Sequence, residues 1–252
     1  MKKTILLIFM FLGICVFGNQ AIAKTVIVGG YLFPPFVEEI SNQHVGITID
    51  LINEMNSFQN KYKFQFVLTS SKRRFGAFDK EKFDLIMFED KKWGWGDKDI
   101  VASKVFLKGG EVYITKAALS KDQSYFDSFK NKSLTVILGY HYGFANFNSD
   151  EKFLKDNFKV EFNSSHEGNI KKVLLERSDI SVVTLSYLLK FFKQNPDKQS
   201  RLLVSKKFDQ QYNHTILLRK NSNIDVKEMN TLLSKLEKAG VLSRIWKKYG
   251  IE

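Results

Sequence analysis

The sequence predicts an α/β fold made of two similar lobes, and three observations lead to this prediction. Residues 25–58 pass from a short apolar strand through an aromatic loop into an amphipathic helix, the first unit of an α/β domain. The order helix, aspartate, apolar strand occurs at residues 78–87 and again at residues 170–183. With 44% hydrophobic residues, the chain of 252 residues can bury two cores of ordinary size.

The N-terminus predicts an export signal. Two lysines precede an apolar run at residues 5–17, and an Ala-x-Ala cleavage site follows. The run is short for a membrane span, although a retained signal anchor is the alternative. Cys15 follows Ile14, where a lipoprotein would have a small residue. We therefore expect a signal peptide at residues 1–23 and a periplasmic protein that is not a lipoprotein and retains no cysteine.

The charge pattern argues against a nucleic-acid partner. The chain carries a net charge of +12, which would suit an anionic partner. Its lysines are scattered through amphipathic segments, however, and they form neither a basic block nor a nucleic-acid-binding motif. We expect a solvated basic surface and no nucleic-acid binding.

The loop after the first strand is the first candidate site. A glycine pair ends the strand at residues 26–30 and permits close backbone approach. A turn with two prolines then holds Phe33 and Phe36 at the carboxyl end of the strand, where open α/β sheets commonly bind ligands. The alternative is that both phenylalanines are only core residues.

The remaining elements continue the α/β pattern to the end of the chain. We expect strands at residues 63–69, 83–88, 133–138 and 179–183, extended runs at 104–115 and 212–220, and helices at 70–78, 170–177, 186–192, 226–236 and 241–249.

A second candidate site follows the strand that ends at Phe88. Trp93 and Trp95 stand beside glycines and are suited to cover a flat or apolar ligand. Glu89 or Asp90 is placed to receive an ammonium group. The alternative is a surface loop whose tryptophans plug the edge of a domain.

A third candidate site follows the strand that ends in Gly139. Tyr140, His141 and Tyr142 come next, where a helix is expected to begin. The free N–H groups of a helix N-terminus can hold an anion. A single histidine such as His141 is more often structural than a ligand contact.

Several of these segments resemble the bacterial extracellular solute-binding proteins of family 3, the polar amino acid type. The resemblance rests on the aromatic–Pro–Phe loop, the Gly-x-x-x-Asp-Leu start of the next helix, the strand after residue 78, the opening of the second lobe at 129–139, and the closing signature at 236–250. It implies a two-lobed type II periplasmic binding-protein fold, with a mixed sheet and flanking helices in each lobe and a ligand cleft between the lobes.

The resemblance also implies a domain division. Lobe 1 would comprise residues 24–113 and 215–252, and lobe 2 residues 114–214. The chain would cross between them near Thr115 and at Tyr212–Asn213.

The charged positions depart from the family pattern. Amino-acid binders of this family clamp the ligand carboxylate with an arginine, and that place holds Gly96 here. The family's acidic residue for the ligand ammonium is replaced by Thr184. Either Arg73 and Glu89 supply these charges for an amino-acid-like zwitterion, or aromatic residues read a different ligand, such as an organic cation, an aromatic compound or a sugar-like molecule.

The candidate ligand-binding set therefore combines the three sites with these replacements. Its members are Phe33, Arg73, Glu89, Trp93, Trp95, Tyr140, His141, Tyr142 and Thr184.

The sequence favours binding over catalysis. Its four histidines are dispersed, and it has no zinc, nucleophile-elbow or phosphate-loop motif, so we expect no enzyme, cofactor or metal. We expect a monomer that carries a small polar solute to the permease of an ABC-type transporter in the membrane. The alternatives are a ligand-sensing partner of a membrane receptor, or a dehydratase on the same fold that uses Glu89 and Asp90.

Overall fold

The computed structural model describes residues 22–251, so nearly all of the predicted signal peptide lies outside the described residues. One sheet of nine strands runs through the molecule in the order β4-β1-β5-β11-β7-β10-β8-β9, and β6 pairs with β11. A separate hairpin consists of β2 and β3. Among the described residues, no helix is long and apolar enough to cross a membrane.

The element bounds follow the predicted order. The strands are β1 (Lys24–Gly30), β2 (Glu38–Ile40), β3 (Gln43–Val45), β4 (Tyr62–Leu68), β5 (Leu85–Glu89), β6 (Ile100–Ala102), β7 (Leu107–Lys116), β8 (Leu134–Ile137), β9 (Val160–Asn163), β10 (Ile180–Thr184) and β11 (Leu202–Arg219). The α-helices are α1 (Ile47–Phe58), α2 (Arg74–Asp79), α3 (Glu151–Asn157), α4 (His166–Leu174), α5 (Leu185–Gln194), α6 (Pro196–Gln199), α7 (Val226–Lys238) and α8 (Val241–Tyr249).

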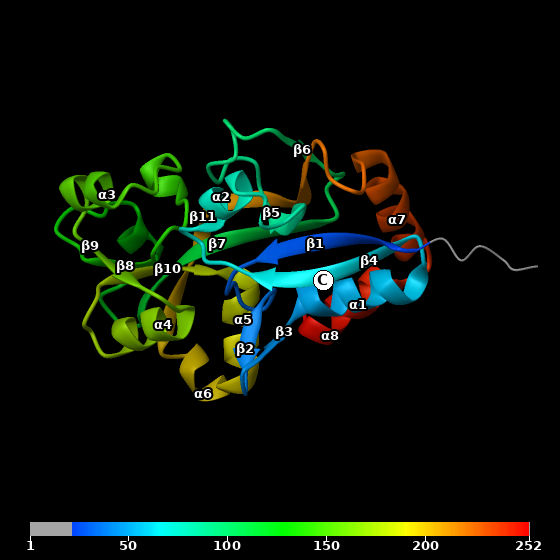
Figure 1. Ribbon diagram of the computed structural model, residues 1–252. Coiled ribbons are helices and arrows are strands. Elements are labelled where there is room, and N and C mark those ends of the chain that lie inside the picture. Colours follow the sequence, from blue (N-terminus) through cyan, green and yellow to red (C-terminus); the bar gives the residue numbers. More distant parts are fainter. Residues whose placement is uncertain (1–21, 252) are drawn as a thin grey trace, which may run out of the picture.

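We call the part that contains β1, β4–β6, α1, α2, α7 and α8 lobe 1, and the part that contains β8–β10 and α3–α6 lobe 2 (Figure 1). In lobe 1, helix α1 buries Ile47, Leu51 and Met55, which recur every four residues on one face. Gly46 precedes this helix with φ of 119°, and a Cβ there would lie 2.6 Å from the carbonyl oxygen of Phe36. Only glycine fits where the aromatic loop meets the helix.

The repeated aspartate performs the same task in both lobes. Asp84 accepts a hydrogen bond from the N–H of Ile27 at 2.7 Å, which ties the start of β5 to β1. Asp179 accepts one from the N–H of Ser133 at 2.8 Å, which ties the start of β10 to β8. The sequence recurrence thus reflects the same strand-to-strand connection in both lobes.

Strands β7 and β11 join the two lobes. They pair antiparallel from Leu202 opposite Lys116 to His214 opposite Leu107. Toward lobe 2, β7 pairs with β10, and toward lobe 1 the last residues of β11 pair with β5 and β6. We call β7 and β11 the crossing strands, because β7 leads the chain from lobe 1 into lobe 2 and β11 leads it back (Figure 1).

Candidate ligand cleft

Eight side chains from both lobes meet on one face of the crossing strands and enclose a cavity of about 10 Å³. They follow the carboxyl ends of β1, β5 and β8, begin α2, or come from the crossing strands, as expected for a site at the ends of parallel strands. We call this set the cleft cluster: Tyr31, Phe33, Arg74, Trp93, Glu111, Tyr140, His141 and Gln210.

A buried ion pair lies at one end of the cleft cluster. The Nε of Arg74 is 3.4 Å from Oε1 of Glu89, and the two side chains are only 2% and 0% exposed. The indole N–H of Trp95 donates to the other oxygen of Glu89 at 2.7 Å. Burial raises the pKa of Glu89, and the charge of Arg74 opposes that rise. Each member of such a pair stays buried only because its partner compensates it.

Arg74 also connects the two lobes. Its Nη1 donates to the carbonyl oxygen of Gly139 at 3.3 Å, and its Nη2 is 3.4 Å from Nδ1 of His141. Both acceptors belong to the loop after β8 in lobe 2. Nearby, Ser71 donates to the carbonyl oxygen of Leu138 at 2.8 Å. The start of α2 is therefore held against lobe 2, and the lobes are closed.

Aromatic rings pack around this connection. The ring of Phe33 lies 5.7 Å from Tyr140 and 6.2 Å from Trp93, both edge-on. The guanidinium of Arg74 lies 5.1 Å from the ring of Tyr31 and 4.3 Å from that of Phe75, within the range of cation–π attraction. The aromatic rings of the cleft therefore already surround a cation, which is the guanidinium of Arg74.

The crossing strands supply a polar floor. Gln210 donates to Oε2 of Glu111 at 2.9 Å and accepts from the indole of Trp93 at 2.9 Å. Burial, followed by the negative charge of Asp209, raises the pKa of Glu111 to about 8. Glu111 is therefore a neutral acid at pH 7. The hydroxyl of Thr184 lies 3.5 Å from Oε1 of Glu111.

The buried histidines near the cleft are neutral. Burial lowers the pKa of His141 to about 3, and the charge of Arg74 adds to this effect. Burial also lowers the pKa of His166 to about 3, and its Nε2 is 3.0 Å from the hydroxyl of Thr184. Among residues 22–251, no three metal-ligating side chains converge on a metal site.

The structure brings together only part of the candidate set. Phe33, Trp93, Tyr140 and His141 line the cavity. Glu89 lies behind Arg74, outside the lining.

Three other candidates are near the cavity without lining it. Trp95 is fully buried and packs edge-on against Phe75 and Phe78 of α2, as the plug alternative describes. The hydroxyl of Tyr142 accepts from the N–H of Ile137 at 2.7 Å within lobe 2. Thr184 reaches the cavity only through Glu111.

Arg73 lies elsewhere. It precedes α2 and is exposed, whereas Arg74 begins the helix and is 1% exposed. Neighbouring residues of a helix point about 100° apart, so one of two adjacent arginines turns inward and the other faces water. The buried charge is carried by Arg74, which the sequence reading passed over.

The sequence reading also missed Tyr31, Glu111 and Gln210. Glu111 is a polar residue inside the extended run predicted at 104–115, which is the one signal the sequence offered for it. Gln210 precedes the run predicted at 212–220, because β11 begins earlier than expected, at Leu202. Buried polar residues in strands are uncommon unless they pair, and these two pair with each other.

Solved structures match this fold along nearly the whole chain, although no family model and no curated protein matches the sequence. An ancestral arginine-binding protein bound to arginine is 22% identical with a TM-score of 0.70, over 91% of this chain and 99% of that one. The GluR0 ligand-binding core from Nostoc punctiforme in complex with L-glutamate is 16% identical with a TM-score of 0.68, over 89% and 98%.

A third neighbour is an ancestral amino acid-binding protein described as a precursor of cyclohexadienyl dehydratase. It is 19% identical with a TM-score of 0.67, over 91% of this chain and 96% of that one. These likenesses confirm the predicted α/β fold, the two-lobed type II periplasmic binding-protein architecture. The neighbours are proteins of the kind that the sequence resemblance indicated.

Proposed function

We propose that this protein is an exported solute-binding protein whose lobes close around a small zwitterion of the amino-acid type. The observation that carries the proposal is the position of Arg74, a buried arginine of lobe 1 whose two terminal nitrogens both contact lobe 2. The fold is that of neighbours described as bound to arginine or to L-glutamate, which supports the same class of ligand.

Opening the lobes would free one donor on each terminal nitrogen of Arg74. In the closed form these donors are taken by Gly139 and His141. A carboxylate accepts two parallel N–H groups from one guanidinium, so a ligand carboxylate would replace both contacts at once. Arg74 would then bind the ligand carboxylate, the role that the family gives to an arginine at the position of Gly96.

The ligand ammonium would be received by Glu111. Its carboxyl group lines the cavity and has a pKa of about 8 because it is buried. A cation beside it would favour the ionised form and lower that pKa. Ligand binding near pH 7 would therefore release a proton from Glu111.

The aromatic rings around the cavity limit which side chains the ligand can carry. Arg74 already occupies the space beside Tyr31 and Phe75 where a cationic side chain would be attracted. The rings of Phe33, Trp93 and Tyr140 border the rest of the cavity. We favour an amino acid with a neutral apolar or aromatic side chain over arginine or lysine.

Export, location and partners form part of the same proposal. A signal peptide at residues 1–23 would deliver the protein to the periplasm, where it would act as a monomer and pass its ligand to a membrane transporter. Lobe 1 would comprise residues 24–113 and 215–252, with bending at Thr115 and Tyr212–Asn213 of the crossing strands. A membrane receptor is the alternative partner, since it would use the same closure as its signal.

One observation bears on an enzymatic alternative. The raised pKa of Glu89 is a property that a general acid in a dehydratase would need. Glu89 does not line the cavity, however, and its oxygens face Arg74 and Trp95. We therefore propose binding without catalysis, and product formation from a bound ligand would be the sign of the enzyme.

Thermal unfolding of residues 24–252 against a panel of ligands tests the proposal. A ligand at 100 times its Kd stabilises the native state by about 2.7 kcal/mol. We expect neutral amino acids to raise Tm, and we expect Arg74→Lys to abolish the rise. Arg73→Lys is the matched control and should keep it. A rise with sugars or organic cations alone would contradict the proposal.

A further inference from the structure

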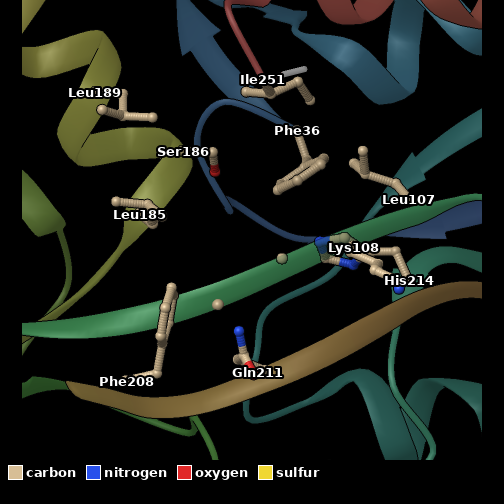
Figure 2. A pocket seen from close by; sticks show the side chains of 12 residues that line it. Phe36, Leu107, Lys108, Leu185, Ser186, Leu189, Phe208, Gln211, His214 and Ile251 are labelled. Atoms are coloured by element: carbon tan, nitrogen blue, oxygen red, sulfur yellow. The ribbon is translucent and has the colours of Figure 1, made fainter. Parts of the chain in front are cut away.

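A second cavity, of about 230 Å³, lies on the other side of the crossing strands. Helix α5 of lobe 2 forms one wall, and Phe36 and the C-terminal Ile251 of lobe 1 form the opposite one (Figure 2). The crossing strands form the floor, with Lys108 on β7 and Gln211 on β11. We call this cavity the hinge pocket.

The hinge pocket is separate from the cleft cluster. The two share no lining residue. Gln210 lines the cleft cavity and its neighbour Gln211 lines the hinge pocket, while His214 projects from the same side of β11 as Gln210 and lies between the two cavities, 6.2 Å from Phe33 and 6.1 Å from Trp93. The crossing strands therefore have one cavity on each face.

The hinge pocket is apolar on its walls and cationic at its edge. Phe36, Leu189 and Phe208 offer hydrophobic and aromatic surface. Lys108 is exposed, and among residues 22–251 it has no ion pair and no acidic side chain lines the pocket. A ring-sized apolar group with one negative charge fits this combination.

Two polar atoms at the pocket have no hydrogen-bond partner in the described part of the chain. The hydroxyl of Ser186 is buried, and Figure 2 shows it directed from α5 toward the interior of the pocket. Nε2 of His214, a side chain that is 1% exposed, is also unpartnered. Both atoms are covered by neighbouring side chains in the closed form, so a ligand reaches them only when those side chains shift. Each unpaired buried group costs about 1–3 kcal/mol, and a ligand that supplies partners after such a shift gains this free energy.

The tautomer of His214 specifies what its free atom can do. Nδ1 lies 2.9 Å from the carbonyl oxygen of Phe88 and must donate to it, which leaves Nε2 as an acceptor. Burial lowers the pKa of His214 to about 3, so the ring is neutral at pH 7. Ser186 can donate to an anion, and His214 can accept from a hydroxyl group.

We propose that the hinge pocket binds a small hydroxylated aromatic carboxylate. The ring lies among Phe36, Leu189 and Phe208, and the carboxylate is held by Lys108 and the hydroxyl of Ser186. The ring hydroxyl donates to Nε2 of His214. Nothing in this assignment requires the cleft to contain a ligand.

Occupancy of the hinge pocket is coupled to closure of the cleft, a consequence that rests on the proposed function. The pocket walls come from both lobes, on the face of the crossing strands opposite the cleft. Rotation that opens the cleft about these strands brings α5 and Ile251 toward each other and reduces the pocket. A molecule in the pocket therefore stabilises the closed arrangement.

Isothermal titration with 4-hydroxybenzoate tests the site directly. We expect saturable binding to the wild type, at least about tenfold weaker in Lys108→Gln because the carboxylate loses its cation. Lys227→Gln removes the same charge from exposed α7 and should bind like the wild type. Ser186→Phe, which fills the pocket, should abolish binding, and neutral 4-hydroxybenzamide should bind at least about tenfold more weakly than the carboxylate.

A cleft variant separates this site from the ligand cleft. Because the pocket is coupled to closure, Arg74→Lys should weaken binding of 4-hydroxybenzoate less than Lys108→Gln does, and Tyr140→Phe, which lines only the cleft, should show the same order if Arg74→Lys fails to fold. Loss in the cleft variant with retention in Lys108→Gln would place the ligand in the cleft and overturn the proposal. No saturable heat at millimolar concentration would also overturn it. If no amino acid raises Tm but 4-hydroxybenzoate binds in a way that depends on Lys108, only the proposed function would be overturned.

Discussion

The two faces of the crossing strands are built in opposite ways. On the cleft face, buried charges and aromatic rings fill the space until about 10 Å³ is left. On the other face, about 230 Å³ stays open between apolar walls, and two buried polar atoms have no hydrogen-bond partner among the described residues. The same two strands supply both floors. The two faces therefore differ in how far they are filled: the cleft face is packed around Arg74, whose Nε also lacks a hydrogen bond within residues 22–251, while the other face has room for an occupant beside the Lys190–Glu38 ion pair that joins α5 to β2.

The largest expected effect comes from breaking the pair on the cleft face. Arg74→Ala leaves Glu89 buried and uncompensated, which should lower the free energy of unfolding by about 3–5 kcal/mol. Urea denaturation measures it. Arg73→Ala changes the exposed neighbour and should stay within about 0.5 kcal/mol of the wild type. Equal effects of the two variants would show that the inward arginine has been misassigned.

Substitution of Trp95 and of Trp93 should distinguish an effect on stability from an effect on ligand binding. Trp95→Ala empties a fully buried position and should cost about 3–5 kcal/mol of stability. Trp93→Ala removes a ring that lines the cavity, so we expect it also to weaken ligand binding by about 2 kcal/mol. Calorimetric titration at a temperature where both variants are folded measures the affinities. A binding defect in folded Trp95→Ala as large as that in Trp93→Ala would refute this division.

The free energy of unfolding should depend on pH through Glu111, on the floor of the cleft. The pKa of Glu111 rises from 4.5 to about 8 on folding, so the folded state holds a proton that the unfolded state gives up. Its contribution is fully present below pH 4.5 and is lost as the pH rises to about 8. Glu111→Gln stays neutral and should exceed the wild type in stability by about 5 kcal/mol above that pH.

Unfolding of Glu111→Gln and the wild type between pH 5 and pH 9 checks this expectation, as both carry the same buried histidines. The difference between the two should grow from pH 5 to about pH 8 and level off above it. A constant difference would mean that Glu111 titrates normally.

The smallest expected effect lies on the open face and has the opposite sign. Ser186→Ala removes a buried hydroxyl that has no partner, so it should be neutral or stabilise the protein by up to about 1 kcal/mol. Thermal unfolding without added ligand measures it. A loss above about 1 kcal/mol would show that the hydroxyl is paired in solution, and the contrast between the two faces would then weaken.

The fold was readable from the sequence because its signals are local. The aromatic loop, the glycine at position 46 and the repeated aspartates at 84 and 179 each act on neighbouring elements. Periodicity predicted α1, α2, α4, α5, α7 and α8, but not the short helices α3 and α6. The order helix, aspartate, strand recurs in both lobes, so each occurrence supported the other.

The cleft residues could be predicted only in part, since a shift of one residue in a helix or strand decides which side chains face the cavity. Whether Arg73 or Arg74 points inward depends on the residue at which α2 begins, which a run of lysine and arginine does not reveal. Glu111 and Gln210 become site residues only when the two crossing strands pair in one register. The hinge pocket joins Phe36, Ser186 and Ile251, which are far apart in the chain, and no local pattern relates them.

The size of the cleft cavity has a consequence for kinetics. A space of about 10 Å³ admits at most one water molecule, so no amino acid can enter the closed form. Each encounter must wait until Ser71 and Arg74 leave the loop after β8. The association rate therefore rises with ligand concentration only until spontaneous opening becomes limiting, and then reaches a plateau. Under the proposed function, the rate of spontaneous opening therefore limits ligand capture at high ligand concentration.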